Sequence, residues 1–179
     1  LAEACAYSGL AHYDSGQYQR AIRDLDEAIR LDPQLAEAYY VRGAYYADQR
    51  DFEKAIANYN EIIRLKPYIA QPYNDRGVAY GNLGRHEQEI QDYDEAIGLD
   101  QDYADPYFNR SAAYYISGQY RRAVQDLDQA IRLSPRDPSA YFNRASAYGK
   151  LGQHERAIQD LDEAIRLNPQ FAEAYFNRG

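Results

Sequence analysis

Three histidines and a single cysteine are the side chains of this sequence best suited to catalysis or metal binding. His86 and His154 occupy equivalent places two repeats apart in a 34-residue pattern, so they cannot share a metal ion or a catalytic site. His12 lies at another position of the pattern, and Cys5 stands where other repeats have an aromatic residue, which favours a packed side chain over a nucleophile. Glycines occur singly rather than in a phosphate-binding cluster. We therefore predict no catalytic residue, no metal site and no cofactor.

A column of arginines at the same spacing could instead bind anions. The column contains Arg42, Arg76, Arg110, Arg144 and Arg178. A second column contains Asp24, Asp92, Asp126 and Asp160, with Asn58 in the remaining place. An arginine can lay its methylene groups along apolar surface and pair its guanidinium with a carboxylate, so we prefer structural pairing of the two columns to a ladder of anion sites. On this interpretation Arg144→Leu should be tolerated better than Asp160→Ala, which strands a charge.

These columns belong to a 34-residue period that runs through the whole chain. Pro33, Pro67, Pro135 and Pro169 share one position, with Gln101 in the missing place. Tyr39, Tyr73, Tyr107, Tyr141 and Tyr175 form an aromatic column, followed four residues later by small residues and seven residues later mostly by tyrosines. Offsets of four and seven place all three columns on one helical face. A glycine between the halves of each repeat, with Arg50 as the exception, can end the first helix, and the proline ends the second.

Each repeat is therefore predicted to be an antiparallel helix-turn-helix hairpin in an all-α protein. Stacking successive hairpins buries the apolar face that one hairpin leaves exposed, which gives a solenoid. We predict one array over residues 1–179. Its repeats are expected at 2–35, 36–69, 70–103, 104–137 and 138–171, with a partial sixth repeat at 172–179.

This residue pattern resembles the tetratricopeptide repeat (TPR) family. The first helix carries an aromatic, a small and a second aromatic residue. The second helix carries alanine, an aromatic residue or leucine, and alanine, and a proline follows it. The resemblance covers nearly the whole chain, and the tyrosine-rich Asn-Arg-Gly style resembles repeats of bacterial proteins. It implies a right-handed superhelical solenoid whose concave groove, lined mainly by the first helices, binds peptides or proteins. The chain departs from the family pattern in the arginine column, where leucine is common, and at Glu89 and Gln101 of the third repeat.

Side chains of the first helices are the candidate peptide-binding residues. The candidates are Tyr40, Asn74, Phe108, Asn109, Phe142, Asn143 and Asn177. Amides can bind a peptide backbone and rings can cover its apolar side chains. The alternative is that the aromatic residues pack against the neighbouring hairpin. Asn109 and Asn143 resemble the asparagine of the carboxylate clamp of heat-shock co-chaperones, but the groove positions carry no lysine or arginine, so binding of a chaperone carboxylate tail is rejected.

Charge and hydropathy exclude two classes of partner. The net charge of -8 and the sequence pI of about 4.9 argue against nucleic-acid binding. No apolar stretch is long enough to span a membrane, and no signal sequence is recognisable. The lone cysteine and these absences favour the cytoplasm. Acid–base pairs at four-residue spacing are expected on the exposed faces of the second helices, between Asp26 and Arg30, Asp128 and Arg132, and Asp162 and Arg166.

The sequence thus predicts a protein-interaction scaffold that holds a peptide or partner protein in its concave groove, and not an enzyme. One alternative is a self-assembling structural module that stacks end to end through residues around Ile158, Ile165 and Tyr175. Another is a regulatory part of a larger multidomain protein. The lack of methionine throughout, including at position 1, is expected of a piece of a longer chain.

Overall fold

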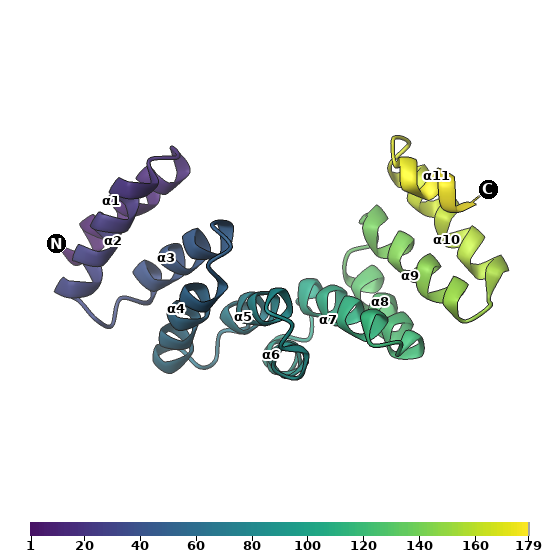
Figure 1. Ribbon diagram of the computed structural model, residues 1–179, viewed down its shortest axis with the longest axis horizontal. Helices are drawn as coiled ribbons and strands as arrows, with labels where there is room; N and C mark the ends of the chain where they lie inside the picture. Colours follow the sequence, from purple (N-terminus) through teal and green to yellow (C-terminus); the bar gives the residue numbers. More distant parts are fainter. Residues whose placement is uncertain (179) are drawn as a thin grey trace. The chain divides into compact units, whose positions relative to one another are not determined.

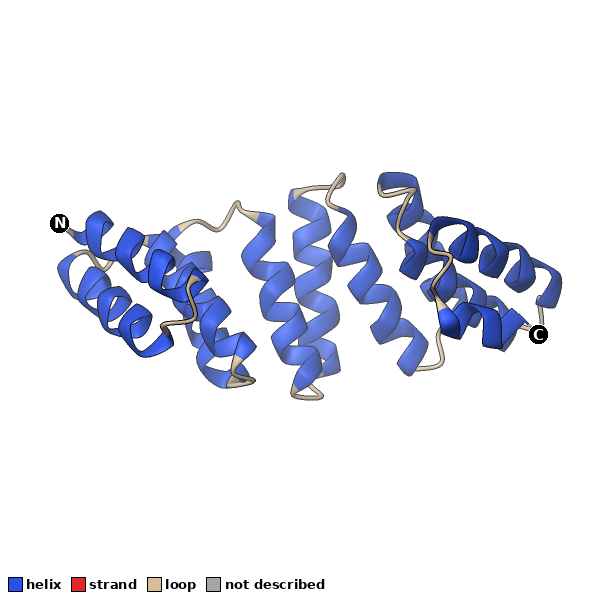
Figure 2. Ribbon diagram, turned by 90° about the horizontal axis from the view of Figure 1, so that it is seen from above, coloured by secondary structure: helices blue, strands red, loops and turns tan. Residues whose placement is uncertain are grey.

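The computed structural model describes residues 1–178, and over that range its regular structure consists of helices, with no strand. Short turns join the helices into antiparallel hairpins, which can be followed from purple to yellow in Figure 1 and as blue ribbons in Figure 2. The helices fall into two compact units, Leu1–Leu99 and Asp100–Gly179. The prediction of an all-α fold built from helical hairpins is confirmed.

The first unit contains three hairpins. They pair α1 (Ala2–Asp14) with α2 (Tyr18–Leu31), α3 (Ala36–Asp48) with α4 (Phe52–Leu65), and α5 (Ala70–Asn82) with α6 (His86–Leu99). Within this unit the second helix of one hairpin also packs on the first helix of the next one, as α2 does on α3 and α4 on α5. Each hairpin therefore buries on its neighbour the apolar surface that it cannot cover alone.

The second unit repeats this arrangement. It pairs α7 (Ala104–Ile116) with α8 (Tyr120–Leu133) and α9 (Pro138–Lys150) with α10 (His154–Leu167), and α11 (Ala172–Arg178) packs on α10. Every pair lies within the limits of one predicted repeat. The assignment of all residues to one continuous array stays a prediction.

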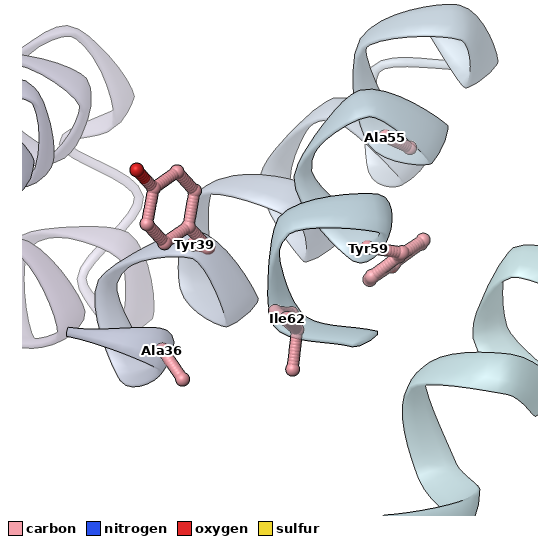
Figure 3. Packing of buried hydrophobic residues seen from close by; sticks show 5 residues of the cluster. All are labelled: Ala36, Tyr39, Ala55, Tyr59 and Ile62. Atoms are coloured by element: carbon pink, nitrogen blue, oxygen red, sulfur yellow. The ribbon is translucent and has the colours of Figure 1, made fainter. Parts of the chain in front are cut away.

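Small residues in the first helices let the paired helices approach closely. Figure 3 shows this core in the second hairpin, where Ala36 and Tyr39 of α3 lie near Tyr59 and Ile62 of α4. A Cβ atom added to Gly43 would come within 2.9 Å of the Tyr59 ring, and one added to Gly77 within 2.7 Å of the Tyr93 ring. A glycine therefore makes room for each of these tyrosines.

The turns inside the hairpins need one residue with a left-handed backbone. Gly16, Gly84, Gly118 and Gly152 adopt φ angles of 70° to 76° there. In the second hairpin Arg50 takes this place with φ 59°, and its neighbour Asp51 still closes the helix by donating its amide hydrogen to the Tyr46 carbonyl at 2.8 Å. At this turn position Arg50 therefore adopts the left-handed backbone conformation that usually requires glycine.

Candidate functional site

A hollow of about 420 Å³ lies in the first unit and is lined by residues of α1, α3, α4 and α5 and of the α4–α5 turn. We call it the first hollow. Its apolar wall comprises Leu10, Ala36, Val41, Ala44, Ile62, Ile69 and Pro72. Its polar rim comprises Tyr13, Glu37, Tyr40, Lys66 and Gln71. First helices of three successive hairpins thus contribute to one apolar depression with polar edges.

The two phenols at the rim are held by carboxylates. Tyr13 donates its hydroxyl hydrogen to Asp48, and this hydrogen bond is the main reason why the pKa of Tyr13 rises to about 12. Tyr40 donates to Asp75 at 3.2 Å, and burial followed by the Asp75 charge raises the pKa of Tyr40 to about 12. Both phenols therefore remain neutral hydrogen-bond donors near neutral pH.

Two further polar contacts complete this rim. Gln71 donates from its side-chain amide to the Tyr40 hydroxyl, which links α5 to α3. Lys66 lies 2.7 Å from the Glu37 carboxylate, and this ion pair lowers the pKa of Glu37, chiefly through its hydrogen bond. The Glu37 side chain is mostly exposed, so the pair is open to exchange with a charged ligand.

A smaller hollow of about 270 Å³ lies in the second unit, between α7, α8 and α9. We call it the second hollow. Ala112, Tyr115, Ile116, Leu127 and Phe142 form its apolar wall, and Ser111, Asn143 and Ser146 are its polar lining. Ser111 and Ser146 each donate to a carbonyl of their own helix. The Asn143 amide has no hydrogen-bond partner in the described part of the chain, so it can accept and donate to a ligand.

The structure places the predicted peptide-binding residues in different environments. Tyr40 lines the first hollow, and Phe142 and Asn143 line the second. Asn177 lines a third hollow of about 300 Å³ beside α9 and α10. These residues are therefore accessible to a ligand, but they are spread over three separate depressions.

The remaining predicted residues lie elsewhere. Phe108 packs against the Leu127 cluster of the second unit, as the packing alternative predicts, and Phe142 also packs, with its ring centre 4.9 Å from that of Phe171. Asn109 is half-buried and already has an interaction partner. Asn74 must be corrected as a groove residue, because it is only 4% exposed and its amide donates to Asp75 at 3.2 Å.

The arginine column faces the second helices. Bidentate hydrogen bonds of 2.6–2.8 Å join Arg76 to Asp92, Arg110 to Asp126 and Arg144 to Asp160. In the second hairpin Arg42 donates to the Asn58 side chain instead. In the first hairpin Ser8 and His12 contact Asp24, and the hydrogen bond from Ser8 is the main reason why the pKa of Asp24 is lowered. The aspartates lie deep in the interface and the guanidinium groups lie over tyrosine rings, so these contacts are part of the packing.

The same arginines have a second partner that sequence reasoning missed. It lies sixteen residues earlier, on the preceding hairpin: Asp26 for Arg42, Asn60 for Arg76, Asp128 for Arg144 and Asp162 for Arg178. The four-residue pairs expected for Asp26, Asp128 and Asp162 are therefore wrong. Arg30, Arg132 and Arg166 pair with Glu27, Gln129 and Glu163 instead. Each of these column arginines thus ties one hairpin to the next.

Side chains with catalytic potential serve packing and local pairing. Cys5 is half-buried against the core of the first hairpin, and His86 lies 2.9 Å from the Glu89 carboxylate. Within residues 1–178 no group of three or more His, Cys, Asp or Glu side chains is arranged to hold a metal ion. None of the described helices combines the length and apolar character needed to cross a bilayer.

Comparison with known proteins identifies the repeat. Sequence patterns of the tetratricopeptide repeat match residues 8–70, 70–103 and 138–171, and the pattern of the TPR repeat matches residues 112–152. The chain belongs to the tetratricopeptide repeat family. The resemblance noted in the sequence is thereby confirmed. Because such repeats are non-enzymatic protein-interaction modules, the prediction of an interaction scaffold and not an enzyme is confirmed in general terms.

Several solved structures share this fold. The MamA protein superposes with a TM-score of 0.85 at 23% identity, covering 96% of this chain and 94% of its own. YrrB, described as a TPR protein with an unusual peptide-binding site, gives 0.78 at 20% identity with coverage of 94% and 87%. The thermophilic TPR protein TTC0263 of Thermus thermophilus gives 0.74 at 21% identity with coverage of 99% and 97%. No curated protein sequence gives a significant match.

Proposed function

We propose that this chain binds extended peptide segments of a partner protein through its first helices, at the first hollow in one unit and at the second hollow in the other. The observation that carries this proposal is the first hollow. It combines apolar walls from successive hairpins with hydrogen-bonding groups at its rim. Sites of this composition bind side chains in the apolar part and orient the backbone through the polar groups.

The second hollow supports the same function with a different chemistry. Its Phe142 ring offers apolar contact, and the open Asn143 amide can pair with a peptide group. Among the similar structures, YrrB is described as having a peptide-binding site, and Cut9 occurs in a complex with Hcn1, which is a precedent for partner binding by this fold. Neither hollow is large enough for a folded domain, so a linear segment fits better than a globular surface.

The test uses two substitutions in the same hairpin that differ in the face they occupy. Ala44 lines the first hollow, whereas Ala57 is exposed on α4 and lines neither hollow. Peptides would be selected from a random display library against the unmodified chain, and their affinities measured by fluorescence anisotropy. Ala44→Tyr should fill the hollow and weaken the selected peptides at least about tenfold, which corresponds to about 1.4 kcal/mol. Ala57→Tyr should change their affinity by less than about twofold.

Asn143→Ala provides the corresponding test in the second hollow. Loss of one hydrogen bond to a peptide group should weaken binding by about three- to tenfold for peptides that reach this site. Circular dichroism melts would verify that the variants remain folded. Selected peptides that bind all variants equally would show that the binding face lies elsewhere on the chain.

The predicted end-to-end stacking receives no comparable support. Ile158 and Tyr175 are about half-exposed, but Ile165 packs against the core of the last complete hairpin. Stacking stays a prediction that the mass of the chain in solution at high concentration would test.

A further inference from the structure

The first helices of the first unit carry an excess of negative charge on one face. Their sequences contain Glu3, Asp14, Glu37, Asp48 and Asp75 against two arginines. Both arginines point toward the second helices, where Arg42 contacts Asp26 and Arg76 contacts Asp92. They therefore do not neutralise the carboxylates near the first hollow.

Three of these carboxylates adjoin the first hollow. Glu37 lines it, and Asp48 and Asp75 accept hydrogen bonds from Tyr13 and Tyr40, whose rings form its rim. A neutral phenol donates a hydrogen bond to a carboxylate without removing the negative charge of that carboxylate. The one ammonium group of the rim, Lys66, is paired with Glu37.

The second hollow lacks this charge. At the repeat position of Asp14 and Asp48 the second unit has Ile116 and Lys150. At the position of Asp75 it has asparagines, and its lining contains no carboxylate. The negative charge is thus a specific property of the first hollow and not a general consequence of the acidic composition.

We propose that the first hollow takes an extended segment in which an apolar side chain stands next to lysine or arginine. This inference rests on the proposed peptide-binding function and names the class of peptide. The apolar side chain fills the space between Leu10, Val41 and Ala44. The neighbouring cation reaches Asp48, which is exposed, or replaces Lys66 at Glu37. Its charge complements the rim, whereas a glutamate or aspartate there would be repelled.

Two synthetic probe peptides test the charge preference directly. One alternates leucine with lysine, and the other has glutamate in place of every lysine. Anisotropy should show the lysine probe binding at least about tenfold tighter, with an affinity that falls as sodium chloride is raised. Asp48→Asn should weaken the lysine probe about two- to fivefold, which is the range for a rim charge pair. Glu95→Gln, which removes an exposed carboxylate of α6 in the same unit, should have almost no effect.

The uncharged Ala44→Tyr substitution separates the two proposals. If both probes bind equally well and both are weakened by Ala44→Tyr, the charge preference is overturned and the groove function stands. If the lysine probe binds tightly but Ala44→Tyr and Ala57→Tyr change its affinity by the same factor, the probe is held by general attraction to an acidic chain, and the inference fails. If neither probe nor any selected peptide responds to Ala44→Tyr, the proposed function falls with it.

Discussion

The pair formed by Arg144 and Asp160 allows a sharp test of how the hairpins are held together. Asp160 has a side chain only 9% exposed, whereas Arg144 is 19% exposed and also contacts Asp128 at 2.7 Å. Its guanidinium carbon lies 5.6 Å and 5.9 Å from the ring centres of Tyr141 and Tyr148. If the pair is broken, Arg144 still has Asp128 and two tyrosine rings as partners, whereas the buried Asp160 carboxylate loses its arginine.

This geometry reverses the order expected from the sequence. Arg144→Leu leaves the buried Asp160 carboxylate without its arginine, and removing one partner of a buried pair costs about 3–5 kcal/mol. Asp160→Ala removes charge-assisted hydrogen bonds worth about 1.5–3 kcal/mol, but Arg144 retains Asp128 and two aromatic rings. We therefore expect Arg144→Leu to be the more destabilising by about 1–2 kcal/mol.

Urea unfolding followed by circular dichroism measures both effects, provided that the dependence of the unfolding free energy on urea stays unchanged. The double variant should be more stable than Arg144→Leu alone, because it no longer buries an unpaired carboxylate. Exposed Asp128 offers a control, since Asp128→Ala should cost at most about 1 kcal/mol. If Asp160→Ala is as destabilising as Arg144→Leu or more so, the reasoning from burial and alternative partners is refuted.

Three further predictions concern the turns, the core and the tyrosines. Arg50→Gly should be more stable than Arg50→Ala by about 0.5–1 kcal/mol in urea unfolding, because only glycine adopts the left-handed turn without strain; equal stability would contradict this. Gly77→Ala should cost about 1–3 kcal/mol by forcing a Cβ against Tyr93, whereas Gly98→Ala, which meets no atom within 4 Å, should gain up to about 1 kcal/mol; equal thermal shifts would argue against the close packing. Because the pKa of Tyr40 is raised on folding, this phenol stabilises the fold below about pH 10, and the contribution is lost as the pH rises toward 12. Over that range the free energy of unfolding should fall by up to about 1 kcal/mol more in the unmodified chain than in Tyr40→Phe. Melting temperatures of the two proteins that fall in parallel with pH would contradict this.

The repeat pattern explains why so much of the hairpin architecture is predictable. A period of 34 residues, with small and aromatic residues four and seven positions apart, specifies which face of each first helix is buried. Glycine and proline mark the two turns because their backbone preferences are local. Arg50 shows that the repeat can impose the turn on a residue that disfavours it, since the flanking helices pack in the same way.

The candidate site is less predictable because its geometry depends on several hairpins at once. Asn74 and Asn143 occupy adjacent positions of the repeat, and both are asparagines of a first helix. Asn74 is nevertheless buried and hydrogen-bonded to Asp75, whereas Asn143 lines the second hollow. Tyr13 is not among the predicted residues, since its column holds residues of several sizes, and only contact with Asp48 of the next hairpin places it at the rim. Such differences follow from which side chains of adjacent repeats meet.

The order of amino acids is enough to specify the helical hairpins, their repeat family, the facing of the arginine and small-residue columns, and the acidic character of the chain. These properties are local or periodic, so they can be recognised in the sequence of each repeat. Three-dimensional packing adds that Arg144 also reaches Asp128, that Asp160 is the more buried partner, and where the two hollows lie. These features depend on distances between side chains of different helices, and the periodic sequence pattern of a single helix does not specify those distances.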